Sequence, residues 1–312
     1  MIISASRRTD IPAFYSEWFM NRLEEGFALV PNPRNPNRLS RVEMSPDNVD
    51  CIVFWTKNPL PMLDKFPQLN KMGYRYYIQF TLTSYDKSVE ANLPPKDELL
   101  NTFISMSKLM SPKQAVWRYD PVIIDGDHSI EWHIDKFSKI CEKLSGHTER
   151  CIISFVDPYK NSARRYRSLM HNEMHSIASG FSKTAVECGI KLFTCAEEID
   201  LSKYGISHSS CIDKTLIEQV TGQEITAKRD ANQRTDCRCI ESVDIGAYGT
   251  CTHGCAYCYA ARQRETPIIE KSNRQSPVIT GYPNGKEIIT NRTAPSQTIN
   301  QISLFKILGK LE

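Results

Sequence analysis

Residues 2–25 of the chain read IISASRRTDIPAFYSEWFMNRLEE, and this stretch sets the pattern for much of the sequence. An apolar, β-rich run at Ile2–Ser6 is followed by the polar cluster RRTD and then by a helix-length segment at Phe14–Glu25. Apolar residues recur in that segment close to the helical period, at Phe14, Trp18, Phe19 and Leu23. The stretch therefore predicts a strand, a polar loop and an amphipathic helix.

The same unit recurs along the chain. Further strands are predicted at Cys51–Trp55, Tyr76–Thr81, Ala115–Arg118, Ile152–Phe155 and Lys191–Thr194. Further helices are predicted at Lys96–Met110, Glu131–Leu144 and Ser162–Glu187. Alternating strands and helices form parallel sheets with right-handed crossovers. We therefore expect an α/β fold, a partial (β/α) TIM-like barrel, with its active site at the carboxyl ends of the strands.

Composition excludes several classes of protein. Lys plus Arg is 39 and Asp plus Glu is 36, a net charge of +3, so the chain does not bind nucleic acid through bulk charge, although a local basic groove stays open. No apolar run approaches the roughly 20 residues of a membrane span. Arg7, Arg8 and Asp10 interrupt any signal-peptide core. We expect a cytoplasmic protein with no membrane partner.

The cysteines point to metal chemistry. There are eleven, an odd number in a chain without an export signal, which favours metal binding or redox chemistry over disulfides. Five of them crowd together, at Cys237, Cys239, Cys251, Cys255 and Cys258. The barrel is expected to span residues 1–265, and residues 266–312 form a C-terminal extension.

Cys251, Cys255 and Cys258 lie in the sequence CTHGCAYC, with the spacing CxxxCxxC. Three thiolates can bind three irons of a [4Fe–4S] cluster and leave the fourth iron open to a small chelating molecule. A structural zinc site needs four protein ligands, usually in CxxC pairs. His253 could be the fourth, but its place inside the short loop makes that ligation awkward. We favour the cluster, with zinc as the alternative.

This motif resembles the signature of the radical S-adenosylmethionine (SAM) superfamily, CxxxCxΦC, with Tyr257 at the aromatic position Φ. The resemblance implies that the methionyl group of SAM chelates the open iron and that Tyr257 lies near the adenine. It also implies reductive cleavage of SAM, a 5′-deoxyadenosyl radical that abstracts a hydrogen, and a reductant such as flavodoxin or ferredoxin.

Nearly the whole chain resembles an uncharacterised family with a C-terminal radical-SAM-like cysteine cluster. The segments that carry this resemblance are SASRRTDIPAFYSEWF, FWTKNP, WRYDP and DIGAYGTCTHGCAYCYA. In most of the superfamily the motif follows the first barrel strand, whereas here it follows a short run at Ser242–Ile245. We therefore expect a circularly permuted radical SAM core, with Ser242–Ile245 beside Ile2–Ser6.

The region 195–239 predicts a second metal site. Cys195 follows a strand, Cys211 opens a helix-like segment, and Cys237 and Cys239 precede the run at Ser242–Ile245. Four converging cysteines would be a complete set for a second [4Fe–4S] cluster. A four-cysteine zinc site, or two core thiols with an unrelated CxC, are the alternatives.

Polar residues at the strand ends are the candidates for binding SAM. Arg118 could pair with the methionyl carboxylate, because a guanidinium matches its geometry. Asp120 could accept hydrogen bonds from the ribose or from Arg118, and a structural network of these two is the alternative. Thr9, Asp10 and Lys57 are the next candidates.

The tail carries a separate motif, made of Gln301, Ile302, Ser303, Leu304 and Phe305. It resembles the pentapeptide by which bacterial DNA-processing proteins bind the sliding clamp, with two apolar anchors and a polar glutamine. A C-terminal helix that packs on the barrel is the alternative. Clamp binding would add weight to a nucleic-acid partner.

The sequence thus predicts a radical SAM enzyme acting on an unknown substrate. One alternative is an enzyme of the same chemistry that repairs or modifies nucleic acid, similar in logic to spore photoproduct lyase. The other is a non-enzymatic iron–sulfur or zinc protein, acting in electron transfer or as a binding scaffold.

Overall fold

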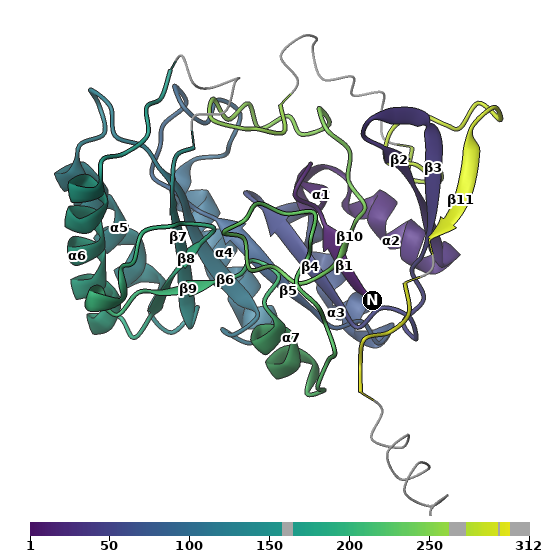
Figure 1. Ribbon diagram of the computed structural model, residues 1–312, viewed down its shortest axis with the longest axis horizontal. Helices are drawn as coiled ribbons and strands as arrows, with labels where there is room; N and C mark the ends of the chain where they lie inside the picture. Colours follow the sequence, from purple (N-terminus) through teal and green to yellow (C-terminus); the bar gives the residue numbers. More distant parts are fainter. Residues whose placement is uncertain (158–164, 262–272, 293, 300–312) are drawn as a thin grey trace, which may run out of the picture.

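The computed structural model describes residues 1–157, 165–261, 273–292 and 294–299. Its largest element is a sheet of eight strands, in which every neighbouring pair is parallel (Figure 1). In spatial order the strands are β10 (Val243–Asp244), β1 (Ile2–Ala5), β4 (Cys51–Thr56), β5 (Tyr76–Thr81), β6 (Ala115–Val122), β7 (Arg150–Phe155), β8 (Lys191–Cys195) and β9 (Ser207–Ser209).

The strand order confirms the α/β class and the parallel sheet. It also confirms the expected neighbours, because Ile3 pairs with Val243 and Ser4 pairs with Asp244 in parallel register. Strand β9 was not predicted from the sequence. The sheet ends at β9 and β10, which do not pair with each other within the described residues.

The strands are connected by helices and by two short 3-10 turns. The helices are α1 (Ile11–Phe14), α2 (Ser16–Glu25), α3 (Phe66–Lys71), α4 (Lys96–Leu109), α5 (Ile130–Leu144), α6 (His171–Glu187) and α7 (Lys214–Thr221), and the turns are η1 (Leu60–Lys65) and η2 (Ser202–Tyr204). The core is aromatic where α5 and α6 pack on the sheet. The Phe137 ring stacks on Trp117 of β6 at 4.8 Å and on Phe181 of α6 at 3.9 Å. No helix among the described residues is long and apolar enough to cross a membrane.

The helix predicted from Ser162 begins later, at His171, and residues 165–170 are not helical. The cause is the Glu173 carboxylate, which accepts a hydrogen bond from the backbone N–H of Met170 at 2.8 Å. It also pairs with Arg167 at 2.6 Å. A carboxylate that accepts a hydrogen bond from a free backbone N–H in this way caps the N-terminus of a helix and fixes where its first turn begins.

A second, smaller sheet has three strands, in the order β11 (Ile288–Arg292), β3 (Asn35–Glu43) and β2 (Phe27–Asn32). Strands β2 and β3 form an antiparallel hairpin, and β11 adds parallel to β3 (Figure 1). The sequence analysis did not predict this small sheet. Strand β11, from the region 266–312, therefore packs against β3 of the N-terminal half, while residues 297–299 also contact residues 224–226. The motif at 301–305 lies outside the described residues.

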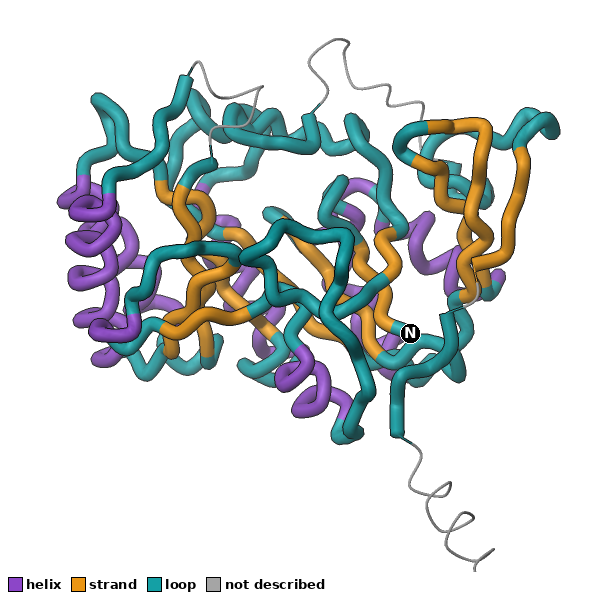
Figure 2. The backbone as a smooth tube through the Cα atoms, viewed as in Figure 1, coloured by secondary structure: helices purple, strands orange, loops and turns teal. Residues whose placement is uncertain are grey.

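All eight parallel strands point the same way, so their carboxyl ends share one edge of the sheet. Figure 2 shows long loops above this edge, among them the segment that follows β10. Several strands end there in polar or cysteine side chains, among them Thr56, Thr81, Cys195 and Asp244, and the site was expected at this edge.

His133 of α5 gives the core a pH dependence. Its ring is fully buried, accepts a hydrogen bond from the Tyr119 hydroxyl at 3.0 Å through Nδ1, and donates through Nε2 to the Ile123 carbonyl at 2.7 Å. Burial lowers the pKa of His133 from 6.5 to about 4. The unfolded chain therefore binds the extra proton more readily than the folded chain between these two values.

We expect the free energy of unfolding to be highest above pH 6.5 and to fall by about 1.4 kcal/mol per pH unit from this group as the pH drops toward 4. Urea unfolding of the wild type and of His133→Gln at pH 7, 6 and 5 measures this. The amide of Gln keeps a hydrogen-bond donor and an acceptor but does not titrate. The contributions of all other titrating groups therefore cancel in the difference between the two proteins. Parallel pH curves for the two proteins would contradict the prediction.

Candidate functional site

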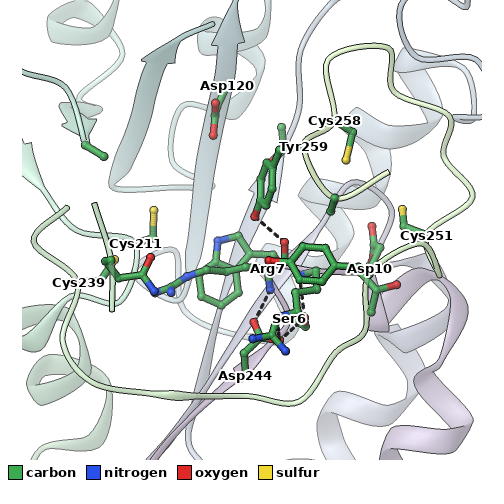
Figure 3. A pocket seen from close by; sticks show the side chains of 18 of the residues that line it. Ser6, Arg7, Asp10, Asp120, Cys211, Cys239, Asp244, Cys251, Cys258 and Tyr259 are labelled. Carbon is green, nitrogen blue, oxygen red and sulfur yellow. Dashed lines mark hydrogen bonds and ion pairs between the residues drawn. The ribbon is translucent and has the colours of Figure 1, made fainter. Parts of the chain in front are cut away.

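A cavity of about 800 Å³ opens at the carboxyl ends of the parallel strands. Both predicted cysteine sets line it: Cys251, Cys255 and Cys258, and Cys195, Cys211, Cys237 and Cys239. Figure 3 shows Cys211 and Cys239 on one side, Cys251 and Cys258 on the other, and Arg7 between them. Seven cysteines from distant parts of the sequence therefore face one space.

Asp244 fixes the position of the segment that leads into the cysteine loop (residues 251–258). Its carboxylate accepts hydrogen bonds from the hydroxyls of Ser4 and Ser6, both at 2.7 Å, and from the backbone N–H of Arg7 at 2.8 Å. Gly246 follows at close range, since a Cβ there would lie 2.0 Å from the Ser6 hydroxyl oxygen. The loop is thus held to the end of β1.

Asp10 fixes the loop itself. Its carboxylate accepts hydrogen bonds from His253 Nε2 at 2.8 Å, from the backbone N–H of Lys57 at 2.7 Å, and from the backbone N–H of Ala13 at 2.9 Å. The His253 ring is buried and lies 4.6 Å from Phe14. His253 Nε2 therefore anchors the loop, whereas its Nδ1 is buried and has no hydrogen-bond partner among the described residues.

The backbone of the cysteine loop packs on residues 89–92. Ala256 donates to the Val89 carbonyl at 2.9 Å, and Asn92 donates to the His253 carbonyl at 3.0 Å. Gly254 has φ +69°, a conformation that favours glycine, and a Cβ there would crowd Asn92. Burial raises the pKa of Cys255 to about 12. A bound metal would be needed to hold it as a thiolate.

Glu90 is a buried carboxylate that the sequence analysis missed. It is 1% exposed, pairs with Lys57 Nζ at 2.7 Å and with Lys96, and accepts a hydrogen bond from the Tyr257 hydroxyl. Burial alone would raise the pKa of Glu90, but the two ammonium groups lower it to about 2. No spacing in the sequence connects residue 90 with residue 257, so only the fold brings them together.

Among the residues predicted to bind SAM, Tyr257 and Lys57 lie together. The Lys57 Nζ is 5.3 Å from the centre of the Tyr257 ring, and both side chains line the cavity. Thr9 also lines it, and its buried hydroxyl has no hydrogen-bond partner among the described residues. These three side chains and the cysteine loop share one cavity.

Arg118 and Asp120 lie beside the other cysteine set. The Arg118 guanidinium donates to Cys211 Sγ at 2.8 Å and pairs with Asp120, which also accepts a hydrogen bond from Ser154. The two residues thus form the structural network that the sequence analysis weighed as the alternative to binding SAM. Arg118 is buried, with its charge already matched by Asp120.

The second cysteine set forms a connected group, the four-thiol cluster (Cys195, Cys211, Cys237 and Cys239). The Sγ atoms of Cys195 and Cys211 are 2.9 Å apart, and interaction with these two thiols lowers the pKa of Cys239 to about 7. All four are buried. The hydrogen bond with Cys239 lowers the pKa of Cys237 to about 6.

The donor chemistry of both cysteine sets fits iron–sulfur binding, because clusters are held by cysteine thiolates. Among the described residues, however, no group of three or more His, Cys, Asp or Glu side chains is arranged to hold a metal ion. Two thiolates bound to one zinc ion at about 2.3 Å lie about 3.8 Å apart, farther than the 2.9 Å between Cys195 and Cys211. The thiols would therefore move apart when a metal binds.

We expect Glu90→Gln to lower the free energy of unfolding by about 3–5 kcal/mol, because it leaves the partly buried ammonium groups of Lys57 and Lys96 without their shared counter-charge. Urea unfolding at neutral pH measures the loss. Glu98→Gln is the matched control, since Glu98 is exposed in the first turn of α4, and its effect should stay within about 0.5 kcal/mol. Equal stability of the two variants would contradict a structural role for Glu90.

Comparison with known proteins places the chain in a family. Among solved structures it is similar to a putative alpha-L-fucosidase from Bacteroides thetaiotaomicron, with 12% identity, a TM-score of 0.28, and coverage of 53% of this chain and 78% of that chain. A TM-score of this size supports no inference about fold or activity. No curated protein matches the chain. A family model described as a domain of unknown function matches residues 2–260, from β1 through the cysteine loop, and the chain therefore belongs to the DUF1848 family.

Proposed function

We propose that this protein is a radical SAM enzyme, which cleaves SAM reductively and abstracts a hydrogen atom from a substrate in the cavity. The observation that carries the proposal is the position of the CxxxCxxC loop, at the carboxyl edge of a parallel sheet and facing a cavity of about 800 Å³. On this proposal the sheet is a permuted radical SAM core, in which β10 takes the place of the first strand.

Cys251, Cys255 and Cys258 would hold the [4Fe–4S] cluster. Bound there and reduced by a flavodoxin or ferredoxin, such a cluster would supply the one electron needed to cleave the S–C5′ bond of SAM, which would give methionine and a 5′-deoxyadenosyl radical able to take a hydrogen atom from the substrate. The protein's own side chains hold the cysteine loop in place. Asp10, Glu90 and Asp244 hold the loop, through His253, Tyr257 and the end of β1.

The cavity also offers groups that could bind SAM. Tyr257 presents an aromatic ring whose hydroxyl is fixed by Glu90. Arg8 is a candidate for the methionyl carboxylate, because its Nε is 3.8 Å from Asp244, a loose pairing, whereas Arg118 is already paired with Asp120. The partnerless Thr9 hydroxyl can donate to a ligand oxygen. Together they offer an aromatic ring, a cation and a hydroxyl, groups of the kinds that the adenine, the carboxylate and the ribose of SAM would require.

We expect the anaerobically reconstituted, dithionite-reduced protein to give a [4Fe–4S] electron paramagnetic resonance signal that changes when SAM is added. The same sample should release 5′-deoxyadenosine. Cys255→Ala should lose both the SAM-dependent change and the product, because one of the three thiolates is missing.

Cys188→Ala is the matched control, since Cys188 caps the C-terminus of α6 and does not line the cavity. It should behave as the wild type. A wild-type protein with a full complement of iron but no SAM-dependent change would contradict the proposal and favour a non-enzymatic iron–sulfur protein.

One observation favours a nucleic acid as the substrate class. The small sheet contributes Asn32, Pro33 and Arg292 to the cavity wall, and Arg34 and Arg38 are exposed on the same sheet. None of these three arginines has an ion-pair partner within the described residues. A cationic surface at the mouth of a cavity attracts phosphate groups, although the net charge of the chain is small.

We expect the protein to bind a single-stranded oligonucleotide with an affinity that falls as salt rises. Replacing Arg34, Arg38 and Arg292 together by Gln should reduce the slope of log K against log salt by about 2. Fluorescence anisotropy between about 50 and 300 mM salt would measure the affinity and its dependence on salt. Matched changes at Lys136 and Lys139 of α5 serve as the control, and equal loss in both variants would contradict a role for the small sheet.

A further inference from the structure

The four-thiol cluster is built from three separate parts of the chain. Cys195 ends β8, Cys211 follows β9, and Cys237 and Cys239 precede β10. Their burial is nearly complete, at 7%, 8%, 7% and 2% exposed. The chain gathers these four thiols from positions up to 44 residues apart, and the Sγ atoms of Cys195 and Cys211 are in contact at 2.9 Å. Such a gathering exceeds what packing of small apolar side chains requires.

Two guanidinium groups face these thiols. Arg118 donates to Cys211 Sγ at 2.8 Å from one side. Arg7 extends from the end of β1 toward Cys211 and Cys239 (Figure 3), and interacts electrostatically with both and with Cys237. The Nη2 of Arg7 is buried and has no hydrogen-bond partner within the described residues. An unpaired buried donor aimed at a group of thiols indicates a missing acceptor.

We propose that Cys195, Cys211, Cys237 and Cys239 bind a second iron–sulfur cluster of the [4Fe–4S] type, and that Arg7 offsets part of its charge while Arg118, paired with Asp120, donates to one of its thiolates. A [4Fe–4S] cluster with its four thiolate ligands carries a net charge of about −2 in the oxidised state, so a guanidinium beside it stabilises the bound form. The sulfides and thiolates of the cluster would accept the free Arg7 donor. This inference goes beyond the proposed reaction at the cysteine loop and does not depend on it.

The location favours iron–sulfur over zinc. Structural zinc sites are closed tetrahedra of four ligands within about 2.3 Å of one ion. The four-thiol cluster instead lines the same 800 Å³ cavity as the cysteine loop. A cluster there would lie beside the substrate space, with Trp55 at its edge, where Arg7 packs over the indole ring at 5.4 Å.

The first test removes the cysteine loop and keeps the four-thiol cluster. We expect the variant with Cys251, Cys255 and Cys258 replaced by Ala to bind about four iron and four sulfide per chain after anaerobic reconstitution. Adding Cys211→Ser to that variant should abolish the iron, whereas adding Cys188→Ala should leave it unchanged. Iron and sulfide analysis, with circular dichroism as the check on folding, gives the readout.

The possible outcomes separate this inference from the proposed function. A folded triple variant with no iron would overturn the second cluster, and so would one tightly bound zinc per chain. Iron retained in the triple variant, with no SAM-dependent signal in the wild type, would support the second cluster while the proposed reaction fails. Loss of all iron in the folded triple variant, with a SAM-dependent signal in the wild type, would support the proposed reaction while the second cluster fails.

A second test examines the charge balance in the triple variant. Replacing Arg7 by Gln removes one positive charge next to the cluster, so we expect a more negative reduction potential. Arg75→Gln is the matched control, because Arg75 is exposed and does not line the cavity. A potential that moves equally in both variants, or in neither, would exclude Arg7 as the balancing charge.

Discussion

The parallel pairing of β10 with β1 is the contact on which the rest of the site depends. It joins Val243 to Ile3 across most of the chain, and the Asp244 carboxylate reinforces it by accepting from Ser4, Ser6 and the backbone of Arg7. Because the strands are parallel, this pairing delivers the cysteine loop to the edge of the sheet where all other strands end. The contacts of the loop with Asp10, Glu90 and residues 89–92 then hold it in place at this edge.

Charge is distributed differently on the two sides of that cavity. Buried carboxylates hold the cysteine loop: Asp10 through His253, and Glu90 through Tyr257 and Lys57. Guanidinium groups face the four-thiol cluster instead. A thiolate–metal centre is anionic, so arginines beside the four thiols would stabilise it. The carboxylates near the three-cysteine loop hold the loop through other side chains.

Local patterns predicted most of the main sheet and little of the small one. Short apolar runs bounded by polar clusters correspond to β1, β4, β5, β6, β7 and β8, because a strand buried on both faces leaves that signature. The hairpin of β2 and β3 alternates less clearly, and β11 joins it from residues 288–292, too far along the chain for any local rule. The start of α6 depends on Glu173, whose role needs its spatial contacts.

The sequence by itself determined which seven cysteines are candidate metal ligands, because residue type and the CxxxCxxC spacing can be read directly from it. Only the tertiary structure decided that both sets share one space, that Glu90 lies under Tyr257, and that Arg118 contacts Cys211. These are contacts between residues tens to hundreds of positions apart. Local spacing cannot specify them, since they arise only when the parallel strands align their carboxyl ends.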